Sequence, residues 1–354
     1  MTNAATDGRT ARWKNSPEGS NWGDFGPDDQ IGRLNWLGPE QVRRGIAEVR
    51  EGRAFCLSMP LDYPGGNVLN PARHPPQRFA TRTPDGTDRY VLRMADALGN
   101  PDLTDVVNDD RVMLHTQYST QWDALSHVGS WFDADGDGAP EPVFYNGWRG
   151  GDDIATAGAC AECGGLTASE ARRLGIETIA ETCVQGRAVL IDLHAIHGTA
   201  HLDIDMAGLD EAMAAQAVEV EQGDMVMFHT GWTGLMLEAR RQPTREMLHG
   251  TCTALEGRDP RLQEWVRDSG VVALIADNYA VERGPSRTGT GPRAGLPLHE
   301  LCLFKLGIPL GEIWWLGDLA GWFRDNGRNR CLLTAPPLRL PGAVGSPATP
   351  VATV

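Results

Sequence analysis

Short runs of consecutive apolar residues, each bounded by polar residues, recur through the second half of the chain. Such runs are typical of strands buried on both faces of a sheet, and they predict strands at residues 188–193, 225–230 and 271–278. Apolar residues at helical spacing between and after these runs predict helices at residues 209–216, 261–267 and 299–306. Strands that alternate with helices predict an α/β fold.

The first part of the chain shows the same two periodicities. Residues 39–49 have a helical pattern with Pro39 in the first turn, and residues 54–61 and 111–120 are predicted to be strands. Residues 1–20 are polar and lack periodicity, which predicts a disordered N-terminal tail. No interior linker stands out, so residues 21–354 are predicted to form one domain with surface loops rich in Gly and Pro at residues 64–66, 74–76 and 287–295.

Composition excludes several classes of function. The net charge of −15 disfavours binding to nucleic acid, which needs a basic face. Lys14 and Lys305 are the only lysines, so a Schiff-base lysine or a phosphate-loop lysine is nearly excluded by supply. No apolar run is long enough for a signal peptide or a membrane span, and the seven cysteines are typical of reduced thiols. We therefore expect a cytoplasmic protein that binds neither membrane nor nucleic acid.

The strongest candidate site is a polar cluster in the run H-T-Q-Y-S-T-Q-W-D-A-L-S-H, residues 115–127. Its members, Gln117, Gln121, Asp123 and His127, all have odd numbers, so in an extended strand they would point to the same face. Such a cluster can be a structural polar edge whose members bind one another. It can also be a metal site built on Asp123 and side-chain oxygens, or a site where His127 is a general base oriented by a carboxylate.

A second candidate is the run H-A-I-H-G-T-A-H, which contains His194, His197 and His201. On a helix their spacing would place three imidazoles on one face, as a zinc site requires. Gly198 and the preceding strand argue against a helix there, and loop histidines are more often exposed than metal-bound.

Three weaker motifs have ordinary explanations. The stretch D-A-D-G-D-G at residues 133–138 imitates the start of a calcium loop, but Phe144 stands where a bidentate glutamate is needed. A single C-x-x-C at residues 160–163 has no second pair, which makes a redox or zinc role weak. The G-T-G at residues 289–291 precedes a proline and not a helix, so it is no dinucleotide fingerprint.

His299 and Glu312 flank a predicted helix that ends at a glycine. Taken alone, they are a histidine near a helix start and a surface acid. Together with Asp123 they would complete a metal site with one imidazole and two carboxylates.

The chain resembles the cyclase-like metal-dependent hydrolases, a superfamily that includes bacterial kynurenine formamidase and isatin hydrolase. The resemblance covers nearly the whole chain, in ordered blocks at residues 21–35, 119–128, 144–147, 186–193, 223–232, 276–282, 299–312 and 337–352. It implies a swivelling β/β/α fold with a compact β core flanked by helices. It also implies a homodimer or a higher homo-oligomer.

The family motif H-x-G-T-H-x-D-x-P-x-H falls on the polar cluster, with glutamine at both metal-binding histidines. Gln117 and Gln121 take those two positions, Asp123 that of the bridging aspartate, and His127 that of the general acid/base. The downstream metal-binding residues of the family fall on His299 and Glu312. Glutamine offers a neutral oxygen in place of an imidazole nitrogen, which weakens zinc binding. The resemblance thus implies one divalent ion, Mn²⁺, Zn²⁺ or Mg²⁺, or a site that holds no metal tightly.

The resemblance implies a metal-assisted hydrolase of a small cyclic or aryl amide, imide or lactone, with His127 as general acid/base. Two alternatives remain: a cyclase or dehydratase-type lyase of secondary metabolism in which Gln117 and Gln121 bind substrate, and a homologue that binds a small molecule without catalysis. The family blocks also supply candidate substrate-binding residues: Trp122, Tyr145, Asn146, Asn278 and Glu282.

Overall fold

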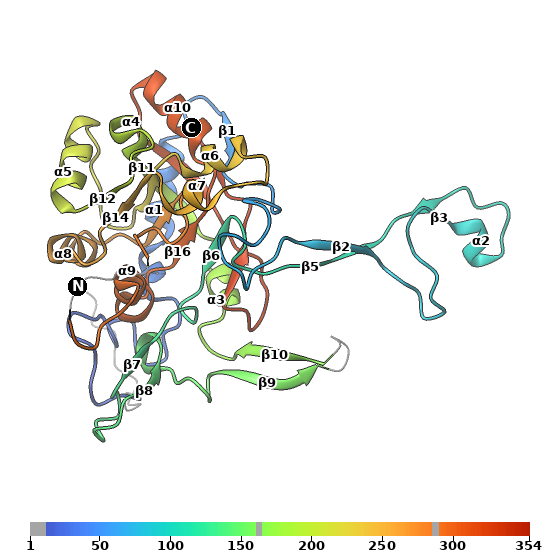
Figure 1. Cartoon of the computed structure of the whole chain (residues 1–354), viewed down its shortest axis with the longest axis horizontal. Helices are drawn as coiled ribbons and strands as arrows, with labels where there is room; N and C mark the ends of the chain where they lie inside the picture. Colours follow the sequence, from blue (N-terminus) through green and yellow to red (C-terminus); the bar gives the residue numbers. More distant parts are fainter. Residues whose placement is uncertain (1–11, 161–164, 285–289) are drawn as a thin grey trace.

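The structure is a computed structural model that describes residues 12–160, 165–284 and 290–354. Its centre is a curled, nine-stranded mixed sheet (Figure 1). In spatial order the strands are β1 (Ala54–Cys56), β19 (Val351–Thr353), β17 (Arg330–Thr334), β11 (Gln185–Asp192), β13 (Met225–His229), β15 (Ala273–Ala276), β16 (Leu310–Glu312), β6 (Gln121–Asp123) and β18 (Gly345–Pro347).

Four neighbouring strands, β11, β13, β15 and β16, run parallel, and the strands on both sides of them are antiparallel. The three buried strands predicted from apolar runs are β11, β13 and β15, so these predictions are confirmed. Parallel strands need crossover connections, and helices supply them here. The expected α/β class, with a β core flanked by helices, is confirmed.

Alternate residues of the central strands enter two separate hydrophobic cores. On β11, Val189 and Ile191 face one core, while Ala188 and Leu190 face the other. The first core is covered by α5 (Met206–Ala215), α8 (Pro260–Asp268), α9 (Pro297–His299) and the π-helical segment η3 (Glu300–Leu306). The second is covered by α3 (Ile176–Glu181) and α10 (Gly317–Asn326). This two-sided burial explains why the strand sequences are continuously apolar.

The predicted helices are present with small changes at their ends. The helix expected at residues 39–49 is α1 (Pro39–Ala47), which packs against β11 and β17. Gly45 permits this contact, because a Cβ there would lie 2.8 Å from the carbonyl carbon of Gly186. The other short helices are η1 (Gly32–Trp36), η2 (Tyr145–Gly147), α4 (Leu193–His197), α6 (Trp232–Glu238) and α7 (Arg245–His249).

Small two-stranded sheets surround the body. They pair β7 (Ser130–Phe132) with β8 (Glu141–Val143), β9 (Ile154–Cys160) with β10 (Leu166–Ala171), and β12 (Leu202–Ile204) with β14 (Thr253–Leu255). Among the described residues, no helix is both long and apolar enough to cross a lipid bilayer.

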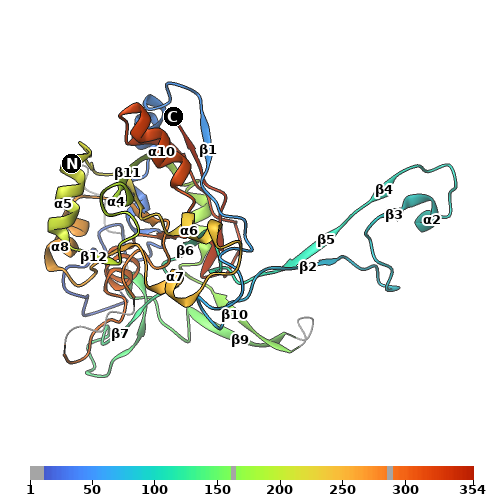
Figure 2. The same cartoon turned by 45° about the horizontal axis from the view of Figure 1, so that its top comes forward.

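A long segment, residues 77–113, projects away from the body, and we call it the arm (Figures 1 and 2). It contains β2 (Gln77–Ala80) paired with β5 (Asp110–Met113), β3 (Leu92–Arg93) paired with β4 (Val106–Val107), and α2 (Met94–Leu98). Apolar side chains along it are exposed: Phe79, Tyr90, Val91, Leu98, Val106, Val112 and Met113. A segment this apolar and this exposed is unusual in a monomer.

Two strand predictions need correction. The strand expected at residues 54–61 is only β1, and the one expected at 111–120 is β5 on the arm, which ends at Met113. A turn closed by Tyr118 N donating to His115 O then breaks the extended chain. Pairing resumes only at β6, so the polar cluster does not share a single strand.

The structure describes the last nine residues of the predicted N-terminal tail, residues 12–20. Residues 12–20 pack on the body, with the Arg12 guanidinium 3.5 Å from the ring centroid of Trp148 and the Trp13 ring 5.5 Å from that of Trp22. Residues 1–11, most of the C-x-x-C at 160–163 and the first position of the G-T-G lie outside the described residues.

Candidate functional site

The register of two antiparallel strands brings an amide and two carboxylates together. Gln121 on β6 lies directly opposite Glu312 on β16, and Asp123 lies two residues further along β6, on the same face as Gln121. Gln121 Nε2 donates hydrogen bonds of 3.1 Å to Asp123 Oδ1 and to Glu312 Oε2. All three side chains are buried.

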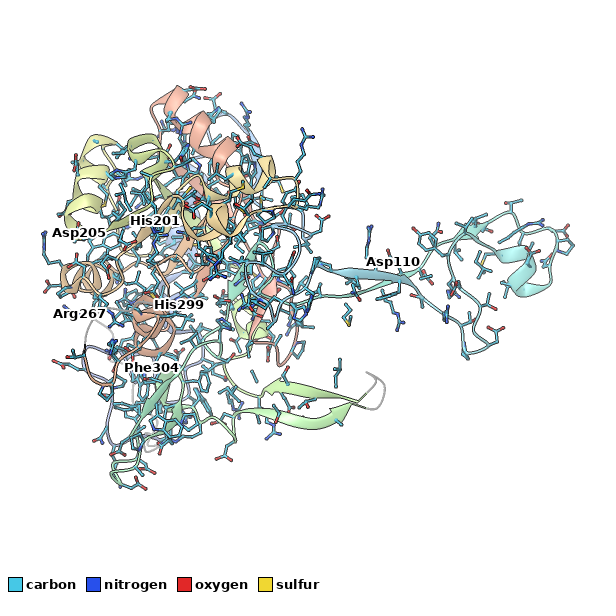
Figure 3. The ribbon with its side chains drawn as sticks, viewed as in Figure 1. Asp110, His201, Asp205, Arg267, His299 and Phe304 are labelled. Atoms are coloured by element: carbon cyan, nitrogen blue, oxygen red, sulfur yellow. The ribbon has the colours of Figure 1, made fainter. Side chains whose placement is uncertain are left out.

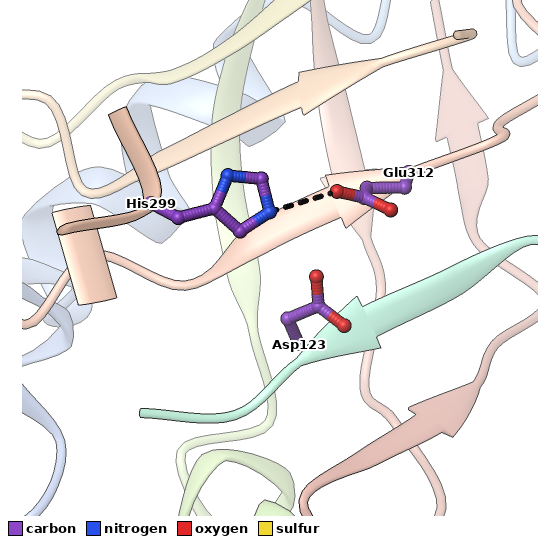
Figure 4. Close-up of side chains that lie close together, drawn as sticks. All are labelled: Asp123, His299 and Glu312. Carbon is purple, nitrogen blue, oxygen red and sulfur yellow. Dashed lines mark ion pairs between the residues drawn. The ribbon is translucent and has the colours of Figure 1, made fainter. Parts of the chain in front are cut away.

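His299 reaches this group from α9, whose start is fixed by Glu282. The two carboxylate oxygens of Glu282 accept from Leu298 N, His299 N and His299 Nδ1 at 2.9–3.0 Å. Since Nδ1 is held by Glu282, His299 presents Nε2 to Glu312, 3.3 Å from Oε1 (Figure 4). One ligand atom each of Asp123, His299 and Glu312 lies within 4.8 Å of the others. The structure thus brings together the three residues that the sequence paired as a metal site.

Two oxygens in this group, Asp123 Oδ2 and Gln121 Oε1, have no hydrogen bond from any described residue, and both are buried. Glu312 Oε1 has its ion pair with His299 Nε2 at 3.3 Å. Buried polar atoms without a partner are costly, so such a set indicates a missing ligand. Carboxylate and amide oxygens together with one imidazole nitrogen are suitable ligands for Mn²⁺, Mg²⁺ or Zn²⁺. An imidazole held by a carboxylate through its other nitrogen is also the usual arrangement at a metal. The residues therefore fit a divalent ion.

The ionisable groups of this site shift one another's pKa values. Burial, helped by the charge of Glu312, raises the pKa of Asp123 well above its usual range. Burial alone would lower the pKa of His299, but hydrogen bonds and charges from Glu282 and Glu312 outweigh it and raise that pKa to about 10. Burial would raise the pKa of Glu312, yet the hydrogen bond and charge of His299 lower it. His299 and Glu312 thus stabilise each other's charged form, while burial disfavours a charge on Asp123.

His127 lies beside the carboxylates, in a turn that follows β6. Its backbone N–H donates to Ala124 O, and its Nε2 is 3.9 Å from Asp123 Oδ1. The side chain is 21% exposed. Burial lowers the pKa of His127 to about 4, so the imidazole is neutral at pH 7 and able to accept a proton.

His127, His299 and Glu312 line a cavity of about 820 Å³. Its far wall includes His249 and Tyr279, which are joined by a 2.7 Å hydrogen bond between Nδ1 and the phenol oxygen. The volume is in the range of pockets that hold a small organic molecule. His201 also lines it, and Figure 3 shows His201 and His299 in the body, away from Asp110 on the arm.

Arg73, at the base of the arm, is a pocket residue that the sequence did not indicate. It precedes the H-P-P run at residues 74–76, which predicted only a surface loop. Its Nη1 donates to Gln117 O at 2.8 Å, which fixes the loop against the start of the polar cluster.

Gln117 lies before β6, and its side chain is beside Gly345, the register partner of Asp123. Its Nε2 lies where a Cβ on Gly345 of β18 would come within 2.5 Å, and its Oε1 accepts from Thr116 Oγ1. It is not among the residues that line the large cavity. The parity argument therefore holds for Gln121 and Asp123 but not for Gln117, because the turn before β6 changes the direction of the chain.

The remaining candidate substrate-binding residues do not line the large cavity. Trp122 faces the second core, where its indole N–H donates to Ala335 O. Asn146 ties down residues 23–29 through its amide, which donates to three backbone carbonyls, and Tyr145 is buried beside it. Asn278 donates to Thr253 O. Glu282 accepts hydrogen bonds from His299 N and His299 Nδ1. The structure therefore gives these residues supporting positions, and a substrate contact for them stays a prediction.

The other sequence candidates are also placed. A short helix, α4, does form at Leu193–His197, but it ends at Gly198, and its histidines are not among the potential metal-binding groups of the described residues. Carboxylate atoms of Asp133, Asp135 and Asp137 do lie within 4.8 Å of one another. Their oxygens accept from backbone N–H groups of the same turn, as in an ordinary acidic turn.

A second buried polar network lies where the parallel strands end. His229 Nδ1 on β13 is 2.8 Å from Asp192 Oδ1 on β11, and its Nε2 is 4.0 Å from Asp277 Oδ2. Arg324 also binds Asp192. Burial alone would lower the pKa of His229, but Asp192 and Asp277 outweigh it and raise that pKa. The sequence analysis missed this network, although a polar residue at the carboxyl end of an apolar strand is a recognised signal.

Comparisons with known proteins find solved structures of similar fold. A solved structure described as a novel cyclase matches with a TM-score of 0.70 and 31% identity, over 95% of this chain and 97% of that chain. Isatin hydrolase A from Labrenzia aggregata matches with a TM-score of 0.53 and 13% identity, over 85% and 93%. Isatin hydrolase A from Ralstonia solanacearum matches with a TM-score of 0.53 and 16% identity, over 85% and 91%. The two isatin hydrolases, at these identities, share the fold.

A comparison with curated proteins finds no match. The model of the Cyclase family, described as "Putative cyclase", matches residues 56–283, which is more than half of the chain. That range contains the whole polar cluster and Glu282, while His299 and Glu312 lie after its end. The chain therefore belongs to the Cyclase family.

Proposed function

We propose that this protein is a metal-assisted hydrolase of a small cyclic or aryl amide, imide or lactone. The observation that carries the proposal is the convergence of Asp123, His299 and Glu312, with an unpartnered oxygen on Asp123, at a cavity that His299, Glu312 and a neutral His127 line. These three residues would hold a divalent ion. When bound, such an ion polarises a carbonyl and lowers the pKa of a water molecule.

The protein residues account for positioning and proton transfer. His127, neutral at pH 7, accepts the proton that the attacking water loses and returns it to the leaving nitrogen or oxygen. Gln121 holds Asp123 and Glu312 in fixed positions through its two hydrogen bonds. Glu282 fixes the orientation of His299. The surrounding core excludes water from the carboxylates, which strengthens their interaction with a cation.

A turnover assay tests the proposal. Protein supplied with MnCl₂ is incubated with formanilide, phthalimide and dihydrocoumarin, which represent an aryl amide, a cyclic imide and a lactone. We expect hydrolysis of at least one of them, and His127→Ala should reduce it about 100-fold or more. The matched control is His115→Ala, an exposed histidine that does not line the cavity. Turnover that survives in His127→Ala would contradict the assigned role.

The lyase alternative has one structural observation in its favour. Gln121 directs its N–H₂ group, and not its oxygen, at both carboxylates, which neutralises part of their charge without a metal. Turnover that persists in protein stripped of divalent ions would favour acid/base chemistry by His127 alone. Ligand binding without any turnover would favour a non-catalytic binding protein.

We also propose that a second copy of this chain covers the arm. Its apolar residues are exposed along both strands, and the arm extends away from the rest of its own chain (Figures 1 and 2). A homodimer in which two arms embrace would bury these residues. This assembly would also fix the arm base, including Arg73, beside the cavity.

A further inference from the structure

Arg73 occupies an unusual position for an arginine so close to two carboxylates. It lines the same cavity as His127, His299 and Glu312 and is partly buried. Its one hydrogen bond in the structure runs from Nη1 to the backbone oxygen of Gln117. Among the described residues, no Asp or Glu forms an ion pair with Arg73, because none has an oxygen within 4.0 Å of its guanidinium nitrogens. The remaining guanidinium N–H groups are therefore available to a ligand.

The other arginines of the cavity differ from Arg73. Arg283 binds Asp203 through Nε at 2.6 Å and donates through Nη2 to the backbone oxygens of Leu202 and Cys252, so two of its three nitrogens are occupied. Arg245 is exposed on α7, and its charge lowers the pKa of His249 after the larger effect of burial. Arg73 instead lines the cavity together with His127, His299 and Glu312.

A guanidinium with a free fork binds a carboxylate through two parallel hydrogen bonds. A dianionic phosphate is less suitable at this place, because Asp123 and Glu312 would repel it. Arg73 is held by Gln117 O, so its orientation is set before a ligand arrives, which lowers the entropic cost of binding.

We infer that the natural substrate carries a carboxylate of its own, which Arg73 binds while the reacting bond lies near His127 and Glu312. This deepens the proposed function, on which it rests for the reaction class. The substrate is thus an acidic small molecule, such as an acylated amino acid or a carboxylated ring. Hydrolysis adds water across the reacting bond and forms a second carboxylate, which stays on the same product when a ring opens and leaves as a separate acid when an acyl group is removed.

Calorimetric binding of benzoate, with benzamide as its neutral counterpart, tests the inference without turnover. Wild-type protein as purified should bind benzoate about 10-fold or more tightly than benzamide, because charge-assisted bidentate contacts are the strong ones. Arg73→Gln should remove this preference and leave benzamide binding unchanged. Arg78→Gln, the same change of charge on an exposed arginine of β2, should behave like wild type.

Other results would overturn the inference. They are benzoate affinity unchanged in Arg73→Gln, a preference for benzamide or inorganic phosphate in wild type, and no benzoate binding at about 10 mM. Loss of benzoate binding in Asp123→Asn with full binding in Arg73→Gln would assign the carboxylate to a bound metal. If Arg73→Gln does not fold, Arg73→Lys, which keeps the charge but loses the fork, must bind benzoate about 10-fold more weakly.

This test is separate from that of the hydrolase. Benzoate binding through Arg73 without hydrolysis of any substrate would overturn the hydrolase and leave the inference standing. Hydrolysis by the wild type together with an unchanged benzoate affinity in Arg73→Gln would overturn the inference and leave the hydrolase standing.

Discussion

Asp192→Asn should destabilise the protein by an amount that depends on pH. Asp192 and His229 are 4% and 6% exposed, and their 2.8 Å contact corresponds to about 6 kcal/mol of attraction at an effective dielectric constant of about 20. Desolvation offsets part of this, and His229 keeps Asp277 at 4.0 Å in the variant. Loss of one partner of a buried pair costs about 3–5 kcal/mol. Because His229 still has Asp277 nearby, we expect the free energy of unfolding to fall by about 3 kcal/mol.

The direction of the pH dependence follows from the pKa shifts. The folded pKa of His229 is raised, so its contribution is complete below the unfolded value of 6.5 and is lost as the pH rises through the folded pKa. The folded pKa of Asp192 is lowered, so its contribution is complete above 3.8 and is lost as the pH falls through the folded value. The difference between wild type and Asp192→Asn should therefore be largest between these two unfolded values.

Urea unfolding from about pH 5 to pH 10 measures this difference. Asparagine keeps the side-chain oxygen that caps α4 by accepting from Ala195 N, so the variant isolates the charge. Asp205→Asn is the matched control, because Asp205 caps α5 in the same way but is exposed, and it should cost less than about 1 kcal/mol. A difference that stays constant or grows as the pH rises would refute the assignment of a protonated, paired His229.

Three further predictions concern the site and the arm. Because burial lowers the pKa of His127 to about 4, the acid limb of kcat/KM due to this base should lie near pH 4, and a limb near the ordinary value of 6.5 would contradict it. Val112→Glu on the exposed arm should shift the mass measured by light scattering from dimer toward monomer, and an unchanged mass would count against arm-mediated assembly. Gly345→Ala should cost about 1–3 kcal/mol in thermal unfolding, because its Cβ would lie 2.5 Å from Gln117 Nε2, whereas Gly234→Ala in the open face of α6 should gain up to about 1 kcal/mol. Equal effects of the two alanines would contradict the close contact.

Local patterns predicted those elements whose burial is uniform along the chain. The apolar runs of β11, β13 and β15 are buried on both faces, so their sequences alone identified them. The prediction of one strand at residues 111–120 was wrong beyond Met113, because the turn at His115 depends on how the arm leaves the body. The order of strands in the sheet was also beyond the sequence, since residues distant in sequence, such as those of β6 and β16, pair there.

The candidate site was predicted only in part for the same reason. Parity correctly placed Gln121 and Asp123 on one face, and the resemblance added His299 and Glu312, which the fold does bring beside them. Nothing local in the sequence marks Arg73, a loop residue whose place at the cavity depends on contact with the backbone of the polar cluster.

Metal analysis of the purified protein tests the central claim most directly. Protein purified without chelator, dialysed against Mn²⁺ and then against buffer, should contain about one divalent ion per chain by plasma mass spectrometry. His299→Asn and Asp123→Asn should lose most of this ion, while Asp137→Asn in the acidic turn should retain it. An ion-free wild type, or an equal metal content in wild type, His299→Asn and Asp123→Asn, would contradict the account.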